Sequence, residues 1–306
     1  MSLALIYEGV DITSRVNISQ CIHDMYAEKH ADTLLLKFSN SEGLWDAWRP
    51  KPGDVLEITD GNVRSGKMFV KKIEPMTGYF ILRASSIPIS TDAEHSQSWE
   101  KVTKLQLAKD FAHNHGLTLK VYGVSDRKFT YLQQSNTKDF VFFENLCVLE
   151  GDAFLVYDGC LILYNEKYME GMSPKRTLKV TGANEFHYTE EMEYSGCTIM
   201  NESKKHTYMK EQKYGYVAER TVQIHIASDG DAEEYAKNML RYLNKKKRKG
   251  QFYIAPISKD YAAGSVINIK TTDTASYDGP VFITHIRHDY KNGKSKVFFR
   301  KPYMEE

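Results

Sequence analysis

The fold is decided by the sequence SQSWEKVTKLQLAKDFAHNHGL at residues 96–117 and by QQSNTKDFVFFENLCVLEGDAFLVYDGCLILY at residues 133–164. In the first segment, Val102, Leu105 and Ala112 fall on one stripe of a helix. Ser98 is a good N-cap residue, and Gly116 can end a helix because glycine adopts a positive φ at little cost. The first segment therefore predicts a helix over residues 99–115.

The second segment predicts another helix followed by a β-hairpin. Asn136 or Thr137 can cap this helix, and Gly151 can end it. Two apolar runs flank Asp158-Gly159, which is the strongest short hairpin signal in the chain. With strand-like runs between the two helices, residues 93–176 are predicted to form a compact α+β unit.

The flanking regions predict strands. Their short runs are apolar or alternate with polar residues, and Gly, Pro, Asn or Asp bound them. Before the α+β unit these runs are residues 3–9, 20–29, 32–39, 54–61, 67–75 and 79–86, with one helix-like stretch at 43–49. After it they are residues 176–182, 185–196, 221–228, 252–258, 265–271, 279–290 and 296–303. The chain is therefore predicted to be mainly β with an α+β insertion, in three units: 1–92, 93–176 and 177–306.

The last unit contains one predicted helix and one polar stretch. The helix begins near Asp229, carries acidic residues in its first turn and basic residues in its last, and has Gly250 just beyond. This order of charges complements the helix dipole. Residues 201–215 predict a long exposed loop or ribbon.

The two β-rich units share a weak internal repeat. Each contains a strand led by glycine, a turn with glycine, a second strand, a tight turn and a third strand. Gly53 corresponds to Gly264, and Gly66 corresponds to Gly279. Duplication explains this order, but any two antiparallel meanders share it as well.

Composition excludes several classes of protein. The 306 residues suffice for two or three domains, and 20 Tyr with 14 Phe favour β-sheet. The 41 Lys plus Arg balance 40 Asp plus Glu, so no global field favours nucleic acid or an anionic membrane. Neither a signal peptide nor a membrane-spanning helix is expected. Reduced, mostly buried thiols and synthesis in the cytoplasm are expected for the cysteines Cys21, Cys147, Cys160 and Cys197.

The histidines do not form a recognisable catalytic site. His113 and His115 spell the His-Asn-His nuclease name, but they lie at a predicted helix end without the required strand and metal. His285 and His288 lie three apart on a predicted strand, so they point to opposite faces and cannot easily share a metal. Ordinary packed or solvated histidines are the favoured interpretation.

Charged clusters give no catalytic site either. Glu190, Glu191 and Glu193 form one acidic run, whereas glycoside cleavage needs carboxylates on two opposed walls. The basic run of Lys245, Lys246, Lys247, Arg248 and Lys249 can contact phosphate. A solvated last turn of the helix explains that run equally well and is favoured. The common nucleotide, hydrolase and zinc motifs do not occur, so no catalytic, cofactor-binding or metal-binding residue is assigned.

Six landmarks occur in order in the middle unit: Ser98-Trp99, His115-Gly116-Leu117, Gln134 with Asn136, Asp139-Phe140, Gly151, and Asp158-Gly159. In order and spacing they resemble the late-control protein D family, which forms the baseplate hub of contractile phage tails. The landmarks cover about a quarter of the chain, and the β-rich flanks fit the layout of that family loosely. They are structural motifs and not catalytic ones.

The resemblance implies a structural protein of a phage tail, a tailocin or a related injection system. Two barrel-like domains related to the tail-tube subunit would flank the small α+β domain. Three copies would then form a pseudo-sixfold ring around a channel, between a sixfold tube and a trimeric spike or needle. Tape-measure protein and DNA would pass through the channel. The particle would be assembled in the bacterial cytoplasm, without a membrane anchor and without a cofactor.

Ring closure would bury the apolar face of the alternating strands at 67–75 and 279–290. The charged residues on their other face, Lys72, Glu74, Arg287 and Asp289, would line either the lumen or the outer rim. The isolated chain can be monomeric if the ring is completed only with tube or spike.

Two other functions compete with the hub. A tail-associated cell-wall hydrolase would need a further domain with a catalytic pair, for which residues up to Glu306 leave no room. A nucleic-acid-binding β-barrel module would need a basic, aromatic strand face and a steep salt dependence of binding.

Overall fold

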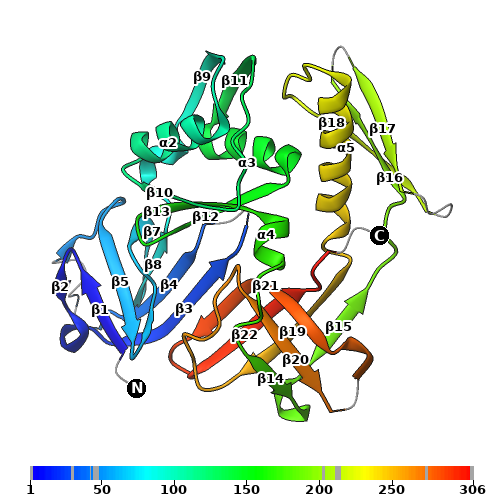
Figure 1. Cartoon of the computed structure of the whole chain (residues 1–306). Coiled ribbons are helices and arrows are strands. Elements are labelled where there is room, and N and C mark those ends of the chain that lie inside the picture. Colours follow the sequence, from blue (N-terminus) through cyan, green and yellow to red (C-terminus); the bar gives the residue numbers. More distant parts are fainter. Residues whose placement is uncertain are drawn as a thin grey trace.

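The computed structural model describes residues 3–28, 31–41, 43, 48–201, 204–210, 215–272 and 275–303. The chain is mainly β, as predicted. Two β-rich lobes lie side by side, with most of the helices above them (Figure 1). The helix-like stretch at 43–49 falls largely outside the described residues.

The first lobe packs its strands around one apolar core. The predicted alternation is clear on β4, where Leu34, Leu36 and Phe38 are buried in turn. The elements of this lobe are β1 (Leu3–Tyr7), β2 (Val10–Asp11), η1 (Thr13–Arg15), β3 (Ile18–Tyr26), β4 (Thr33–Ser39), β5 (Val55–Asp60), β6 (Val63–Arg64), β7 (Met68–Met76), β8 (Tyr79–Ser85) and η2 (Ile89–Asp92).

The second lobe has a core of its own. Phe252, Ile283, Val297 and Phe299 are among its buried side chains. Its elements are β14 (Thr177–Val180), η3 (Gly182–Asn184), β15 (His187–Glu190), β19 (Arg248–Ile254), β20 (Val266–Thr271), η4 (Ala275–Tyr277), β21 (Gly279–Asp289) and β22 (Lys294–Arg300).

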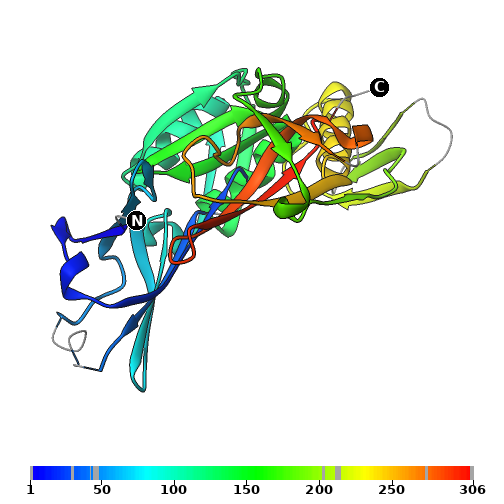
Figure 2. The same ribbon diagram turned by 90° about the horizontal axis from the view of Figure 1, so that it is seen from below.

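The two lobes share one continuous sheet. Strand β3 of the first lobe pairs antiparallel with β21 of the second, so the sheet runs in the order β15-β19-β22-β21-β3-β4-β8-β7-β5-β1-β2. The blue and red ribbons of the two lobes meet along this line in Figure 2. In the described part of the chain this path is open at both ends. Two separate tube-like barrels therefore remain a prediction.

The helices share a third core with three small sheets. Helix α5 packs on α3 and on β16 and β17, although α5 belongs to the last predicted unit of the sequence. Figure 1 shows α5 standing beside the sheet of β16, β17 and β18. The elements of this helical part are β9 (Glu94–Glu100), α2 (Lys104–Asn114), β10 (Thr118–Tyr122), β11 (Tyr131–Lys138), α3 (Asp139–Glu150), β12 (Asp152–Tyr157), β13 (Cys160–Asn165), α4 (Glu166–Glu170), β16 (Gly196–Met200), β17 (Lys205–Met209), β18 (Val217–Thr221) and α5 (Asp229–Asn244).

The predicted start of the first helix is wrong. Ser98 and Trp99 lie in β9, which pairs with β11, and Trp99 stacks on Phe142. The helix α2 begins at Lys104, because the Thr103 side chain accepts a hydrogen bond from the amide of Gln106.

The second helix also begins later than its predicted caps. Asn136 lies in the irregular part of β11, Thr137 pairs within that strand, and the N-cap position of α3 is Lys138. The predicted ends hold better, because Gly116 and Gly151 adopt positive φ of 68° and 72°. The Asp158-Gly159 turn joins β12 to β13 as predicted.

Two further predictions in the last unit fail. The predicted strand at 221–228 ends with β18 at Thr221, although Val222, Ile224 and Ile226 are buried in alternation as in a strand. The Val222 amide still donates to the Met200 carbonyl oxygen at 2.8 Å, and burial in the helical core accounts for the rest of the pattern. Helix α5 ends at Asn244, and Gly250 lies within β19 instead of just beyond the helix.

The internal repeat extends to individual hydrogen bonds. Gly53 and Gly264 both have a positive φ, of 98° and 82°. The amide of Gly53 donates to the carbonyl oxygen of Val70 at 2.8 Å, and the amide of Gly264 donates to that of Ile283, also at 2.8 Å. Val70 and Ile283 are therefore equivalent residues.

The strand order repeats as well. One unit reads β3-β4-β8-β7-β5-β1, and the other reads β15-β19-β22-β21-β20-β14. A one-residue bulge directly follows each of the equivalent residues Val70 and Ile283, at Lys71 in β7 and at Thr284 in β21. One difference is that β5 pairs antiparallel with β1, whereas β20 pairs parallel with β14. Agreement in order, bonding and bulges favours duplication over a chance likeness of two meanders.

Candidate assembly surface

The pairing of β3 with β21, called here the seam, joins the two repeated units. On one face of the seam the Arg287 guanidinium donates to both oxygens of Asp24, at 2.8 and 3.2 Å. His285 lies 2.6 Å from Asp24 Oδ1, and its ring stacks between Tyr26 and Phe298. Although burial opposes ionisation, His285 and Arg287 lower the pKa of Asp24.

The other face of the seam buries two histidines. His23 and His288 lie opposite each other with ring centroids 6.0 Å apart. His288 Nδ1 lies 2.7 Å from Ser295 Oγ, and His23 Nδ1 lies 3.3 Å from Tyr290 Oη. Burial lowers the pKa of His288 to about 4, and burial together with the neighbouring His288 lowers that of His23 to about 3.

The seam continues into a charged sheet surface, called here the open face. Residues directly opposite in neighbouring strands point to the same side. The registers therefore place these polar residues on one surface: Gln20, Asp24, Lys37, Lys72, Glu74, Arg83, Gln251, Tyr253, His285, Arg287, Asp289, Lys294 and Lys296. The four charged residues predicted to lie opposite the apolar face, Lys72, Glu74, Arg287 and Asp289, are among them.

Cations outnumber carboxylates on the open face, but several are paired. Glu74 accepts from Arg83 at 2.5 Å and lies 3.3 Å from the Lys72 ammonium. The Lys296 ammonium lies over the rings of Tyr253 and Phe298. The open face has six Lys and Arg side chains against three carboxylates, so pairing balances only part of its positive charge.

An ionic cluster fixes the helical part to both lobes. Lys245 at the end of α5 contacts both Glu28, just after β3, and Glu166 of α4. Glu170 bridges Arg241 and Arg300, at 2.8 and 2.6 Å. All six side chains, Glu28, Glu166, Glu170, Arg241, Lys245 and Arg300, are buried.

The cluster balances three carboxylates against three cations. Burial opposes the ionisation of Glu28, but the attraction of Lys245 and Arg300 outweighs it and lowers the pKa of Glu28. For Glu166, burial prevails and raises the pKa. The ammonium group of Lys245 is enclosed by carboxylates. Lys245 is therefore not part of a solvated turn, which was the favoured interpretation of the basic run, and it cannot contact phosphate.

Three further residues of the basic run pair with the acidic run, whereas the Lys246 ammonium lies over the ring of Tyr242. Lys247 and Lys249 lie 3.1 and 2.7 Å from Glu191, and Arg248 lies 3.1 Å from Glu190. Glu193 pairs with Lys210 at 3.1 Å. Glu190, Glu191 and Glu193 thus form an ion-paired strand edge.

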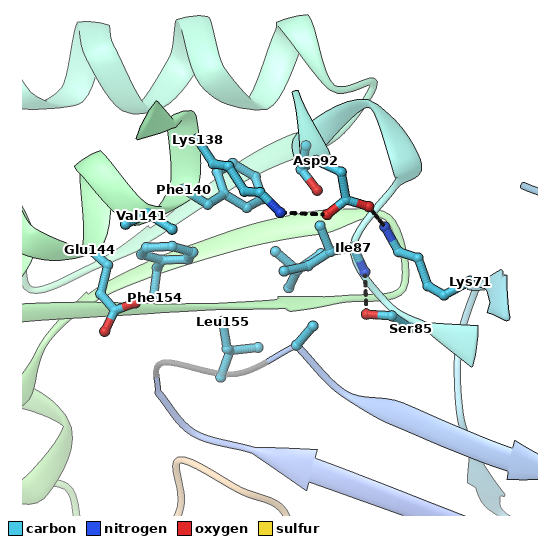
Figure 3. A pocket seen from close by; sticks show the side chains of 13 residues that line it. Lys71, Ser85, Ile87, Asp92, Lys138, Phe140, Val141, Glu144, Phe154 and Leu155 are labelled. Carbon is cyan, nitrogen blue, oxygen red and sulfur yellow. Dashed lines mark hydrogen bonds and ion pairs between the residues drawn. The ribbon is translucent and has the colours of Figure 1, made fainter. Parts of the chain in front are cut away.

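A pocket of about 270 Å³ lies between the first lobe and α3. Figure 3 shows Asp92 in this pocket between two ammonium groups, with Lys71 at 2.8 Å and Lys138 at 3.2 Å. Phe140 and Phe154 form part of its apolar wall. Lys71, which forms the bulge of β7, thus borders both the sheet and this pocket.

The two histidines at the end of the first predicted helix, His113 and His115, have different surroundings in the structure. His113 is exposed, whereas His115 is buried and lies 2.9 Å from Ser90 Oγ and 3.0 Å from Asp139 Oδ2. The serine faces Nδ1 and the carboxylate faces Nε2, the reverse of a serine hydrolase triad. Gln134 also donates to Asp139, at 2.9 Å. These contacts tie η2, α2 and α3 together.

The cysteines and the other side chains that could bind a metal show no such site in the part of the chain that the structure describes. Cys21, Cys147 and Cys197 are buried, Cys160 is partly exposed, and all four are free thiols. Within the described ranges, no three histidine, cysteine or acidic side chains are grouped as metal ligands would be. The described helices include none long and apolar enough to cross a membrane.

Sequence reasoning missed the seam and the ionic cluster. The buried His23 and the buried Glu28 both fall within the predicted strand at 20–29, which looks like any other half-buried strand in the sequence. The sequence carries no signal for Arg241 either, because it is one of several charged residues in the predicted helix near Asp229.

No protein-family model and no curated protein matches the chain. Solved structures do match. A tail protein from Neisseria meningitidis MC58 has a TM-score of 0.75 at 12% identity, covering 97% of this chain and 95% of that one. The 43 kDa tail protein of prophage MuSo2 from Shewanella oneidensis has a TM-score of 0.74 at 12% identity, with 98% of both chains covered.

A third similar structure is an Escherichia coli component of the type VI secretion system. It is described as structurally similar to the T4 bacteriophage tail proteins gp27 and gp5. The TM-score is 0.64 at 12% identity, with 98% of this chain and 77% of that chain covered. The chain thus has the fold of phage tail proteins and of type VI secretion components. The predicted likeness to the baseplate hub family is confirmed in its fold.

Proposed function

We propose that this chain is a structural baseplate hub protein, three copies of which form a pseudo-sixfold ring around a central channel. The observation that carries the proposal is the internal repeat, because two equivalent units are already joined edge to edge by the seam. Each chain also keeps one unpaired strand edge on β15 and a partly unpaired edge on β7 among the described residues. A second seam of the same kind would therefore join one copy to the next.

Three copies with two units each supply six similar units. Such a ring can contact a sixfold tail tube on one side and a threefold spike or needle on the other without breaking either symmetry. The predicted units 1–92 and 177–306 would supply the two tube-like parts, and residues 93–176 the α+β part. The similarity to tail proteins and to a type VI secretion component supports this role.

The open face is proposed to line the channel. It carries ion-paired charges, which resist sticky apolar contacts with a passing tape-measure protein or DNA. The opposite faces of the same strands are filled by the two lobe cores. The particle would be a virion or tailocin whose tail baseplate is assembled in the bacterial cytoplasm together with other baseplate proteins.

A catalytic role is not proposed. The triad-like contacts of His115 have the reversed order described above, so they give no support to a cell-wall hydrolase.

A nucleic-acid-binding module remains the second candidate, because one observation favours it. The stacked rings of Tyr26, His285 and Phe298 lie on the open face beside Lys296. This combination suits base stacking. The carboxylate of Asp24, which pairs with His285 and Arg287, opposes it.

The test is the mass and symmetry of the particle, alone and after co-expression with tail tube and spike proteins. Native mass spectrometry and negative-stain imaging are expected to give three times the 35.2 kDa chain mass in a threefold ring. A chain that stays monomeric with and without those partners would contradict the hub. Salt-sensitive binding of single-stranded DNA by that monomer would favour the nucleic-acid module.

A further inference from the structure

We infer that strand β15 of one copy pairs antiparallel with β7 of the next copy, in the register that the seam already uses within the chain. The inference rests on the proposed ring and deepens it by naming the residues of the contact. It follows from the repeat, in which the partners of the seam, β3 and β21, have β15 and β7 as their counterparts.

The equivalence of β15 and β3 can be traced residue by residue across each unit. Val70 and Ile283 are equivalent because each accepts the amide of its leading glycine. From Val70 the row of opposite residues runs through Ala84 and Leu34 to His23. From Ile283 the corresponding row runs through Phe299 and Gly250 to Tyr188. His23 of β3 is thus equivalent to Tyr188 of β15.

The seam then fixes the register between copies. Within the chain, His23 lies opposite His288, which is four residues after the bulge at Thr284. The residue four after the bulge at Lys71 is Pro75, so Tyr188 lies opposite Pro75 of the next copy. By the same steps Glu191 lies opposite Lys72, as Tyr26 lies opposite His285. The last pair brings opposite charges together.

The free backbone groups of β15 suit this pairing. The amide of Glu191 donates to the Lys247 carbonyl oxygen at 2.8 Å, so the alternate amides of Tyr188, Glu190 and Met192 point to the unpaired edge. Their equivalents in the seam include Ala27, whose amide donates to the Thr284 carbonyl oxygen at 2.9 Å. Met192 would therefore donate to the carbonyl oxygen of the next copy's Lys71.

Side-chain burial supports the same contact. Ala27 packs in a cluster with Val266 and Phe282, which are 2% and 1% exposed. Their counterparts in the first lobe, Val55 and Phe69, are only half-buried. Met192, the counterpart of Ala27, is 71% exposed. In the assembled ring Met192 covers Val55 and Phe69, beside Lys71 and the pocket of Figure 3.

Pro75 limits the length of the contact. It lacks an amide hydrogen, and the register places its nitrogen on the edge that faces the next copy. Pro75 can therefore accept a hydrogen bond from Tyr188 but donates none. A proline on an exposed edge also discourages pairing in other registers.

Disulfide cross-linking tests the register. Glu191→Cys with Lys72→Cys, and separately Thr189→Cys with Glu74→Cys, place thiols at pairs that lack mutual backbone hydrogen bonds, where Cα atoms come close enough for a disulfide. Both are made with Cys160→Ser, which removes the partly exposed native thiol. The control, Thr189→Cys with Lys72→Cys, is two residues out of register. After mild oxidation of assembled rings, both matched pairs should give covalent trimers at about tenfold or higher yield than the control.

The outcomes separate the two proposals. Threefold rings without cross-links at either matched pair, or with efficient cross-links only in the control, overturn the register but leave the hub intact. Absence of any ring, with or without tube and spike, overturns both.

A side-chain variant provides a second measurement. Met192→Asp should weaken ring formation at least tenfold by native mass spectrometry and leave the circular dichroism of the chain unchanged. Met209→Asp, which changes a methionine that is 49% exposed on β17, should leave ring formation unchanged. Equal effects of the two variants would contradict the proposed contact.

Discussion

Lys245 has two carboxylate partners in the structure, Glu28 and Glu166, and both come from distant parts of the chain. Sequence alone predicted a solvated residue, because the nearest acidic partner along the chain is 79 residues away. Local patterns contain no information about such partners. The same holds for Arg300, which is 1% exposed and was predicted only as part of a strand.

Replacing Lys245 should destabilise the fold strongly. Lys245→Met leaves Glu28 and Glu166 buried without their common cation, and breaking a buried pair costs about 3–5 kcal/mol. Urea unfolding at pH 7 measures this loss in the free energy of unfolding.

The matched control is Lys247→Met. Its ammonium pairs with Glu191 near the surface, where an ion pair contributes about 1 kcal/mol or less. Equal losses for the two variants would show that the cluster does not hold the lobes and helices together. Adding Glu166→Gln to Lys245→Met should restore part of the loss, because one uncompensated charge is removed.

At the scale of elements, sequence predicted most strands and the ends of both middle helices. Turn glycines are the reason, because Gly116 and Gly151 need a backbone conformation that other residues rarely adopt. The starts were predicted less well. In the sequence, residues 98–100 continue the helical spacing of the residues that follow them. In the structure they pair with β11 as part of a strand instead.

Gly151 also determines how α3 meets α5. A Cβ atom there would lie 2.9 Å from Asn238 Oδ1, and the Asn238 amide donates to the Leu149 carbonyl oxygen at 2.8 Å. Gly151→Ala is therefore expected to cost about 1–2 kcal/mol for the left-handed conformation, and more for the displaced amide.

Gly159→Ala isolates the backbone cost. Gly159 has a φ of 70°, and a Cβ atom there would meet no atom within 4 Å. Chemical denaturation should find Gly151→Ala the more destabilising by about 1 kcal/mol or more. Similar losses would mean that Asn238 adjusts freely.

At the scale of the whole molecule, the pattern of glycines and strands already indicated a repeat. It could not show that the units pair through β3 and β21, because register depends on contacts between residues more than 250 positions apart. The open face was likewise indicated only in part, by Lys72, Glu74, Arg287 and Asp289.

The histidines of the seam make stability depend on pH. In the unfolded chain His23 and His288 titrate near 6.5, whereas in the fold their pKa values are about 3 and about 4. At pH values between 6.5 and the lower pKa values of the fold, the unfolded chain binds more protons than the folded chain does. The free energy of unfolding therefore falls as the pH falls below 6.5. Each imidazole contributes a slope of about 1.4 kcal/mol per pH unit at most.

The comparison uses urea unfolding between pH 7 and pH 4.5. The double variant His23→Gln with His288→Gln should have a flatter profile than the wild type, and the exposed-residue control His113→Gln should not. Asp24, whose pKa is lowered, contributes mainly at more acidic pH. Identical profiles for wild type and double variant would contradict the assignment.

The seam within the chain has a further consequence for how a ring responds to dilution. Two units held on one polypeptide meet at an effective concentration set by the tether and not by the amount of protein present. Only half of the junctions in a ring of three chains are then bimolecular. Dilution would therefore open the ring at β15 and β7 and release whole chains with β3 still paired to β21. In such a ring His23 and Tyr188 would hold equivalent positions in the two kinds of junction, so the tethered and the untethered contacts would differ in their residues.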